Sequence, residues 1–81
     1  MSKLYYQKRI IDLQAQIKRE QEAAKRDREM YDRNIKSCSS TAGKASYRKS
    51  KAEKAAYHKA KIERLRVEVA QARLNKAKEK N

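Results

Sequence analysis

The chain has 81 residues and a formal net charge of +13, with one Gly, one Cys, one His and no Pro, Trp or Phe. This length allows at most one small domain, and a single cysteine excludes an internal disulfide. Because no apolar run is long enough for a signal peptide or a transmembrane helix, we expect a soluble, intracellular (cytoplasmic) protein.

The composition is dominated by good helix formers, and the clearest break is the stretch from Ser37 to Gly43, at the midpoint. Small hydroxyl residues and Gly favour turns and caps over helix interiors. The sequence therefore predicts an all-α fold, an antiparallel two-helix hairpin resembling a coiled coil. We expect one domain over residues 1–81, with helices at 3–37 and 42–78, a turn at 38–41 and a frayed tail at 79–81. A later start for the second helix, at the capping-box pattern of Ser50 and Glu53, is the alternative.

Apolar residues of the first arm recur at steps of three and four, which places them on one helix face. They are Tyr6, Ile10, Leu13, Ile17, Ala24, Tyr31, Ile35 and Cys38. Gln21 and Arg28 interrupt this line, so its most hydrophobic part lies near the N-terminus.

The second arm has its large apolar residues near the C-terminus, where an antiparallel hairpin places them opposite the N-terminal part of the first arm. The predicted hairpin interface consists of Tyr6, Ile10, Leu13, Ile17, Ile62, Leu65 and Val69, with Ala72 continuing the line. Two independent patterns thus agree on the same pairing of the arms.

Further apolar residues lie elsewhere around both helices. They are Leu4, Ile11 and Ala15 on the first arm, and Ala45, Ala52, Ala56, Ala60, Val67, Ala70 and Leu74 on the second. A helix with two apolar faces usually has two neighbours. We therefore expect a homodimer in which two hairpins form a four-helix bundle.

No catalytic constellation, phosphate-binding loop or metal-ligand cluster is visible in the sequence. The hairpin register places His58 opposite roughly Asp27 or Met30 and far from Cys38, so the two do not form a nucleophilic pair. We expect His58 to be a surface residue and Cys38 to be a small packed one. The chain is predicted to be non-enzymatic, with no cofactor and no small-molecule substrate.

Positive charge is concentrated in the second half, which has a net charge of +9 for residues 41–81 against +4 for residues 1–40. Lysine and arginine neutralise phosphates, and tyrosine stacks on unpaired bases. The sequence predicts binding to nucleic acid, DNA or RNA, largely without sequence specificity and through the second helix. The candidate residues are Lys44, Arg48, Lys49, Lys51, Lys54, Lys59, Lys61 and Arg64, with Tyr47 and Tyr57 for stacking. Five of these form a band with His58 at steps of three and four along the helix: Lys44, Arg48, Lys51, Lys54 and Lys61.

Two alternatives remain open. The hairpin could be an adaptor, inhibitor or assembly factor that binds an acidic protein partner through its helical faces. Binding to an anionic membrane surface is less favoured, because the apolar faces are rich in Ala and lack the bulky residues that such binding requires.

Overall fold

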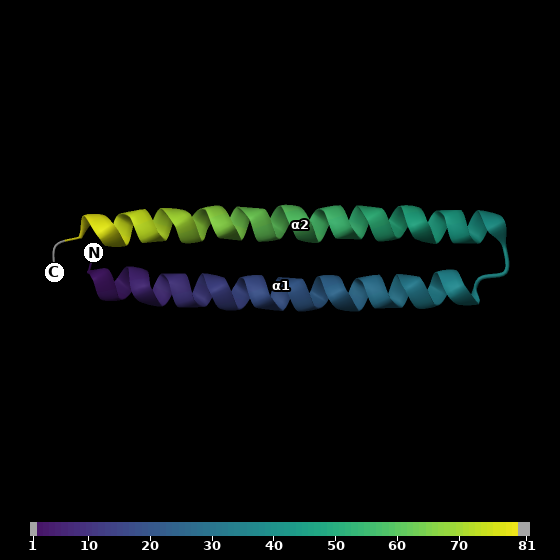
Figure 1. Ribbon diagram of the computed structural model, residues 1–81, viewed down its shortest axis with the longest axis horizontal. Coiled ribbons are helices and arrows are strands. Elements are labelled where there is room, and N and C mark those ends of the chain that lie inside the picture. The colour runs from purple at the N-terminus through teal and green to yellow at the C-terminus, as the bar shows by residue number, and fades with distance from the viewer. Residues whose placement is uncertain (1, 80–81) are drawn as a thin grey trace.

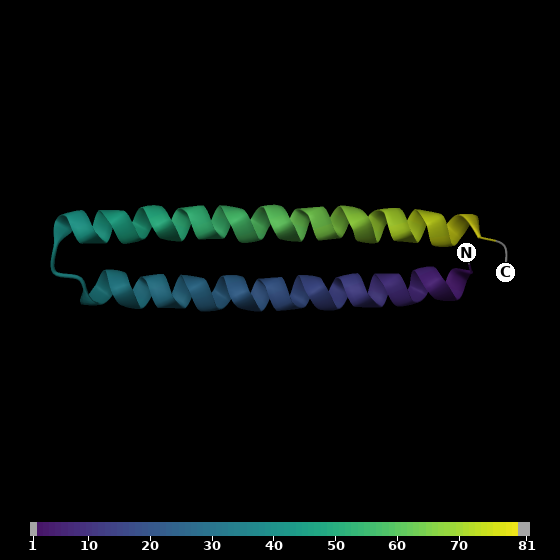
Figure 2. The ribbon, with the colours of Figure 1, turned by 180° about the vertical axis from the view of Figure 1, so that it is seen from behind.

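Two long antiparallel helices form the hairpin that the computed structural model describes for residues 2–79. Helix α1 spans Lys3–Ser37 and helix α2 spans Thr41–Lys78, and they lie side by side along their whole length (Figure 1). The Cα atoms fill a straight rod of 62 × 14 × 11 Å. Both views place the chain ends at one end of the rod and the connection at the other (Figure 2). The predicted all-α helical hairpin is confirmed; residues 80–81 of the predicted tail lie outside the described part.

Hydroxyl side chains cap the N-terminus of each helix. The Ser2 hydroxyl accepts a hydrogen bond from the backbone N–H of Tyr5 at 3.3 Å, and the Ser40 hydroxyl accepts one from Gly43 at 3.0 Å. Such bonds satisfy donors that have no partner within the helix. Because Ser40 provides this cap, α2 begins at Thr41, and the capping-box pattern at Ser50 and Glu53 lies inside the helix.

The connection between the helices is short, and Cys38 contacts both the end of α1 and Ser40, the residue that caps α2. Cys38 caps α1 through its backbone N–H, which donates to the Asn34 carbonyl at 3.0 Å. Its Sγ lies 3.6 Å from the Ser40 carbonyl oxygen. A Cβ atom on Gly43 would stand 2.6 Å from that Sγ. The only glycine of the chain thus lies where the Cys38 thiol leaves too little room for a Cβ atom.

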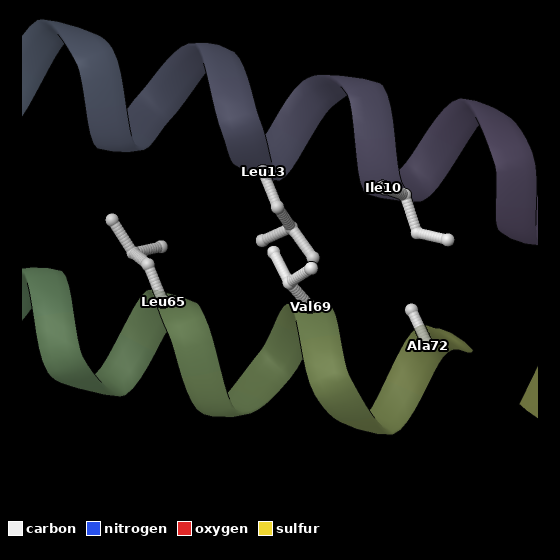
Figure 3. Close-up of a cluster of buried hydrophobic side chains, with 5 residues drawn as sticks. All are labelled: Ile10, Leu13, Leu65, Val69 and Ala72. Carbon is white, nitrogen blue, oxygen red and sulfur yellow. The ribbon is translucent and has the colours of Figure 1, made fainter. Parts of the chain in front are cut away.

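The hydrophobic core lies in the half of the rod that carries the chain ends. It consists of five buried side chains, Ile10, Leu13, Leu65, Val69 and Ala72 (Figure 3). Tyr6 and Ile17 are partly buried and pack against this cluster, and Ile62 is half-buried. Leu13 is the most deeply enclosed, with 1% of its surface exposed. The apolar steps of the two arms meet here as the sequence pattern indicates.

Beyond the core, toward the turn, the line of contact differs from the one predicted. Gln21 and Arg28 are exposed, and Glu20 and Asp27 lie toward α2 instead. The spacing of three and four residues continues from Ile17 through Glu20, Ala24 and Asp27, because a straight helix keeps these positions on one face. The contact between the helices therefore changes from apolar to charged near the middle of the rod.

Several large apolar side chains stay exposed near the chain ends. Leu4 is 61% exposed, Ile11 57%, Val67 68% and Leu74 57%. The alanines of the predicted second stripe on α2 are exposed as well. Within residues 2–79, neither helix has a segment apolar and long enough to cross a membrane.

Candidate functional site: a buried histidine and a basic surface

His58 is buried between the helices and bonded to two carboxylates of α1. Its ring has Nδ1 at 2.6 Å from Glu20 Oε1 and Nε2 at 2.6 Å from Asp27 Oδ2. The residue is 7% exposed, and Glu20 is 9% exposed. The expectation of a surface histidine is therefore wrong, because the carboxylates of the facing helix provide it with buried partners. The expected position opposite Asp27 agrees with the structure.

The two bonds establish the charge of the ring. An ionised carboxylate only accepts hydrogen bonds, so both ring nitrogens must donate, and the ring is an imidazolium. The hydrogen bonds to Asp27 and to Glu20 raise the pKa of His58 above its ordinary value and outweigh the opposing effect of burial. The hydrogen bond from His58, assisted by Lys61, lowers the pKa of Glu20 although burial acts in the opposite direction.

Lys61 completes this group, which we call the His58 network: His58, Glu20, Asp27 and Lys61. The Lys61 Nζ lies 3.2 Å from Glu20 Oε2, so Glu20 receives bonds from two cations. The Asp27 side chain is 34% exposed and that of Lys61 is 40% exposed, so the network reaches the surface. Within it, two positive and two negative groups balance in charge.

The His58 network joins the two helices through the bonds of His58 on α2 to two carboxylates of α1. Both ring nitrogens are engaged by carboxylates, which leaves no free lone pair for a metal ion or for general base chemistry. In the described residues, 2–79, no group of three or more His, Cys, Asp and Glu side chains is arranged to hold a metal ion. What the arrangement can do is fix one register and couple the stability of the hairpin to pH.

The sequence contained a signal for this network. Glu20 follows Ile17 by three residues, Asp27 follows Glu20 by seven, and His58 precedes Leu65 by seven. These are positions that the apolar line occupies elsewhere. If the apolar lines of the two helices are continued at the same spacing regardless of residue type, Glu20, Asp27 and His58 fall in the interface.

The predicted basic band on α2 runs partly along the contact with α1. Lys51 Nζ lies 2.5 Å from Asp32 Oδ1, and Lys61 contacts Glu20. Lys44, Lys51 and Lys61 are half-buried. Three members of the band, Lys51, His58 and Lys61, therefore form ion pairs with carboxylates of α1.

The other candidate cations of α2 face solvent. They are Arg48, Lys49, Lys54, Lys59 and Arg64, all exposed. Among the ion pairs within residues 2–79, none involves these five. Lys54 Nζ lies 5.8 Å from the centre of the Tyr57 ring, which is within the range of a cation–π contact. Tyr47 and Tyr57 are 37% and 58% exposed, so both rings are accessible.

These five cations carry most of the accessible charge of the predicted site.

No protein-family model, no curated protein and no solved structure matches the chain. The function is accordingly inferred from shape, charge and exposed side chains.

Proposed function

We propose that the hairpin binds nucleic acid largely without sequence specificity, through the solvent-facing cations of α2. The observation that supports this is the exposure of Arg48, Lys49, Lys54, Lys59 and Arg64 without ion-pair partners in residues 2–79. A net charge of +13 on 81 residues attracts a polyanion from a distance. The proposal places the protein inside the cell, in association with DNA or RNA.

The shape of the molecule suits such binding. A straight rod 62 Å long can lie along many phosphates, and each cation that neutralises a phosphate releases a counterion. Contacts of this kind position a protein on nucleic acid without reading its sequence. The exposed Tyr57 ring, with Lys54 beside it, adds a surface on which an unpaired base can stack.

A titration with four fluorescently labelled probes of random sequence, duplex DNA, duplex RNA, single-stranded DNA and single-stranded RNA, at several salt concentrations, tests the proposal. We expect the logarithm of the affinity to fall linearly with the logarithm of the salt concentration. The double variant Lys54→Gln/Arg64→Gln should give a shallower slope, whereas Lys3→Gln/Lys8→Gln on α1 is the matched control. Absence of binding to all four probes at low salt would contradict the proposal.

A second candidate function is supported by the exposed Leu4, Ile11, Val67 and Leu74. Apolar residues on the outside of helices form contacts with partner helices. The partner would be an acidic protein, which makes the hairpin an adaptor, inhibitor or assembly factor, or a second copy, which makes a homodimeric four-helix bundle. Sedimentation equilibrium distinguishes these two, and weak salt dependence of partner binding separates both from phosphate binding.

A further inference from the structure

One ion pair shows which sides of the two helices meet. Arg9 directly precedes the buried Ile10, and Glu68 directly precedes the buried Val69. The Arg9 Nη2 atom lies 3.4 Å from Glu68 Oε1. Residues that directly precede an interface position on either helix therefore share one side of the rod, which we call the Arg9 side.

On α1, this rule places a row of arginines on the Arg9 side. Arg19 directly precedes Glu20 and Arg26 directly precedes Asp27, while Arg33 precedes the half-buried Asn34. All three arginines are exposed. They recur every seven residues, so they lie on one face of the helix with a rise of about 10 Å between neighbours.

On α2, the same rule places Tyr57, which precedes His58, and Arg64, which precedes Leu65, on this side. Lys54 lies against the Tyr57 ring, and Lys61 reaches from this side to Glu20. An open hollow beside Tyr57 is lined by Tyr31 of α1 and by Ser50, Glu53 and Lys54 of α2. The two helices thus each contribute a row of cations to the same side of the rod, with the rings of Tyr57 and Tyr31 near them.

The arginines of these rows have no ion-pair partner inside the described part of the molecule, residues 2–79. Over residues 2–79, no ion pair or side-chain hydrogen bond involves Arg19, Arg26, Arg33 or Arg64. The carboxylates that directly follow the first two arginines, Glu20 and Asp27, are already bonded to His58. Their negative charge is therefore balanced before any ligand approaches.

We infer that the Arg9 side is a two-helix binding surface for the phosphate backbone of nucleic acid, formed by Arg19, Arg26 and Arg33 of α1 together with Lys54, Tyr57 and Arg64 of α2. This inference rests on the proposed function, adds α1 to it and narrows the α2 contact to Lys54 and Arg64, since Lys59, which directly follows His58, lies on the other side. Arginine suits the role because its planar group donates two hydrogen bonds to a phosphate. The opposite side also carries exposed cations, among them Lys18, Lys25, Lys59 and Arg66, but the exposed Tyr57 ring lies on the Arg9 side.

Adjacent residues of α1 provide a matched test of the two sides. The variant Arg19→Gln/Arg26→Gln removes two charges from the Arg9 side. The variant Lys18→Gln/Lys25→Gln removes two charges from the other side at nearly the same positions along the helix axis. All four positions are exposed, and Gln has a helix propensity close to that of Arg and Lys. Circular dichroism should show that both variants keep the helical content of the parent protein.

The probes are a 20-base-pair duplex of random-sequence DNA and one of its single strands. For the duplex, we expect Arg19→Gln/Arg26→Gln to weaken binding roughly 10-fold at low salt and to reduce the salt slope by about 1.8, since each lost phosphate contact lowers it by about 0.9. The lysine variant should change the slope by much less. Replacing Tyr57 with Leu should weaken binding to the single strand more than binding to the duplex.

The outcomes separate this inference from the function on which it rests. Binding by the parent protein with equal losses in the two double variants, or with a larger loss in the lysine variant, overturns the Arg9 side as the interface and leaves nucleic-acid binding in place. Failure of the parent protein to bind these two DNA probes and the RNA probes of the same lengths overturns both.

Discussion

The Nε2 atom of His58 lies 2.6 Å from Oδ2 of Asp27, and this bond joins the middle of α2 to the part of α1 nearer the turn. With the bond from Nδ1 to Glu20, it places a buried cation between two anions of the facing helix. Buried polar groups in coiled coils restrict the register, because a shifted alignment leaves them without partners. A slide of α2 by one heptad would remove His58 from at least one carboxylate, so the His58 network favours the observed alignment.

Stability of the hairpin should fall as pH rises above neutrality. The pKa of His58 is raised in the folded state, so its contribution is complete below the unfolded value of about 6.5 and is lost as pH rises through the folded value. The groups that face the ring are Glu20, Asp27 and the edge-on ring of Tyr57. Thermal unfolding followed between pH 5 and 10 should show the decline, and NMR titration of the single histidine should give its pKa directly.

The variant His58→Gln is the control for this pH dependence. It lacks a titrating group at this position, so its melting temperature should stay nearly constant where that of the parent protein falls. The role assigned to the ring would be contradicted if the melting temperatures of the two proteins fell equally as pH rises, or if the pKa of His58 were at or below about 6.5.

Removal of either carboxylate should destabilise the hairpin, and Glu20 should matter more than Asp27. Glu20→Gln removes an acceptor that serves both His58 and Lys61 in a buried place, and a cost of about 1–3 kcal/mol in unfolding free energy is expected. Asp27→Asn should cost less, since the Asp27 side chain is 34% exposed against 11% for Glu20. Urea denaturation at pH 6 measures both differences.

A third variant, Glu22→Gln, changes an exposed carboxylate of the same helix and should stay within about 0.5 kcal/mol of the unfolding free energy of the parent protein.

Unfolding at acidic pH provides an independent check on Glu20. Because the pKa of Glu20 is lowered, its contribution is present above the unfolded value and disappears as pH falls through the folded one. Glu20→Gln should therefore lose less stability on acidification than the parent protein does. Equal acid sensitivity in the two proteins would count against the assigned role of Glu20.

The sequence was sufficient for the apolar half of the hairpin but not for the charged half. Leu13 and Val69 lie on regular apolar lines, and such lines are the strongest secondary-structure signal in a single sequence. Ser40 and Gly43 marked the turn through their own backbone preferences. These features are local or periodic, so they can be read without knowledge of the partner helix.

His58 could not be placed by residue type, because histidine, glutamate and aspartate are usually exposed and become buried only when they are paired. Pairing is a property of two helices together. The same reason explains Lys51 and Lys61, which belonged to a basic band in the sequence and hold α1 in the structure. The division of cations between the two sides of the rod also required a contact, the ion pair of Arg9 with Glu68, to establish which side chains of the two helices lie together.

Truncation of Leu13 should be the most damaging single change in the core. Its side chain is 1% exposed, and a buried Leu→Ala substitution typically costs about 2–5 kcal/mol. For a two-helix protein with few large apolar residues, this loss should appear as a clear fall in helical circular dichroism at room temperature. The matched control is Ile11→Ala, two residues earlier, whose side chain is 57% exposed and whose truncation should cost within about 0.5 kcal/mol in the monomer. A loss for Ile11→Ala that equals that of Leu13→Ala at low protein concentration would show that the core is assigned incorrectly.

The turn should respond to changes at Gly43 and Cys38 in a non-additive way. Gly43 is inside α2, where Ala is favoured over Gly by about 1 kcal/mol, but an added Cβ would approach Cys38 Sγ to 2.6 Å. We therefore expect Gly43→Ala alone to give little or no gain in unfolding free energy. In the background of Cys38→Ala, which removes the sulfur, the same change should stabilise the hairpin by about 1 kcal/mol. Urea denaturation of the four proteins of this cycle measures the coupling between the two positions. If Gly43→Ala has the same effect with and without the thiol, then the close approach of Cys38 is not what keeps glycine at the start of the second helix.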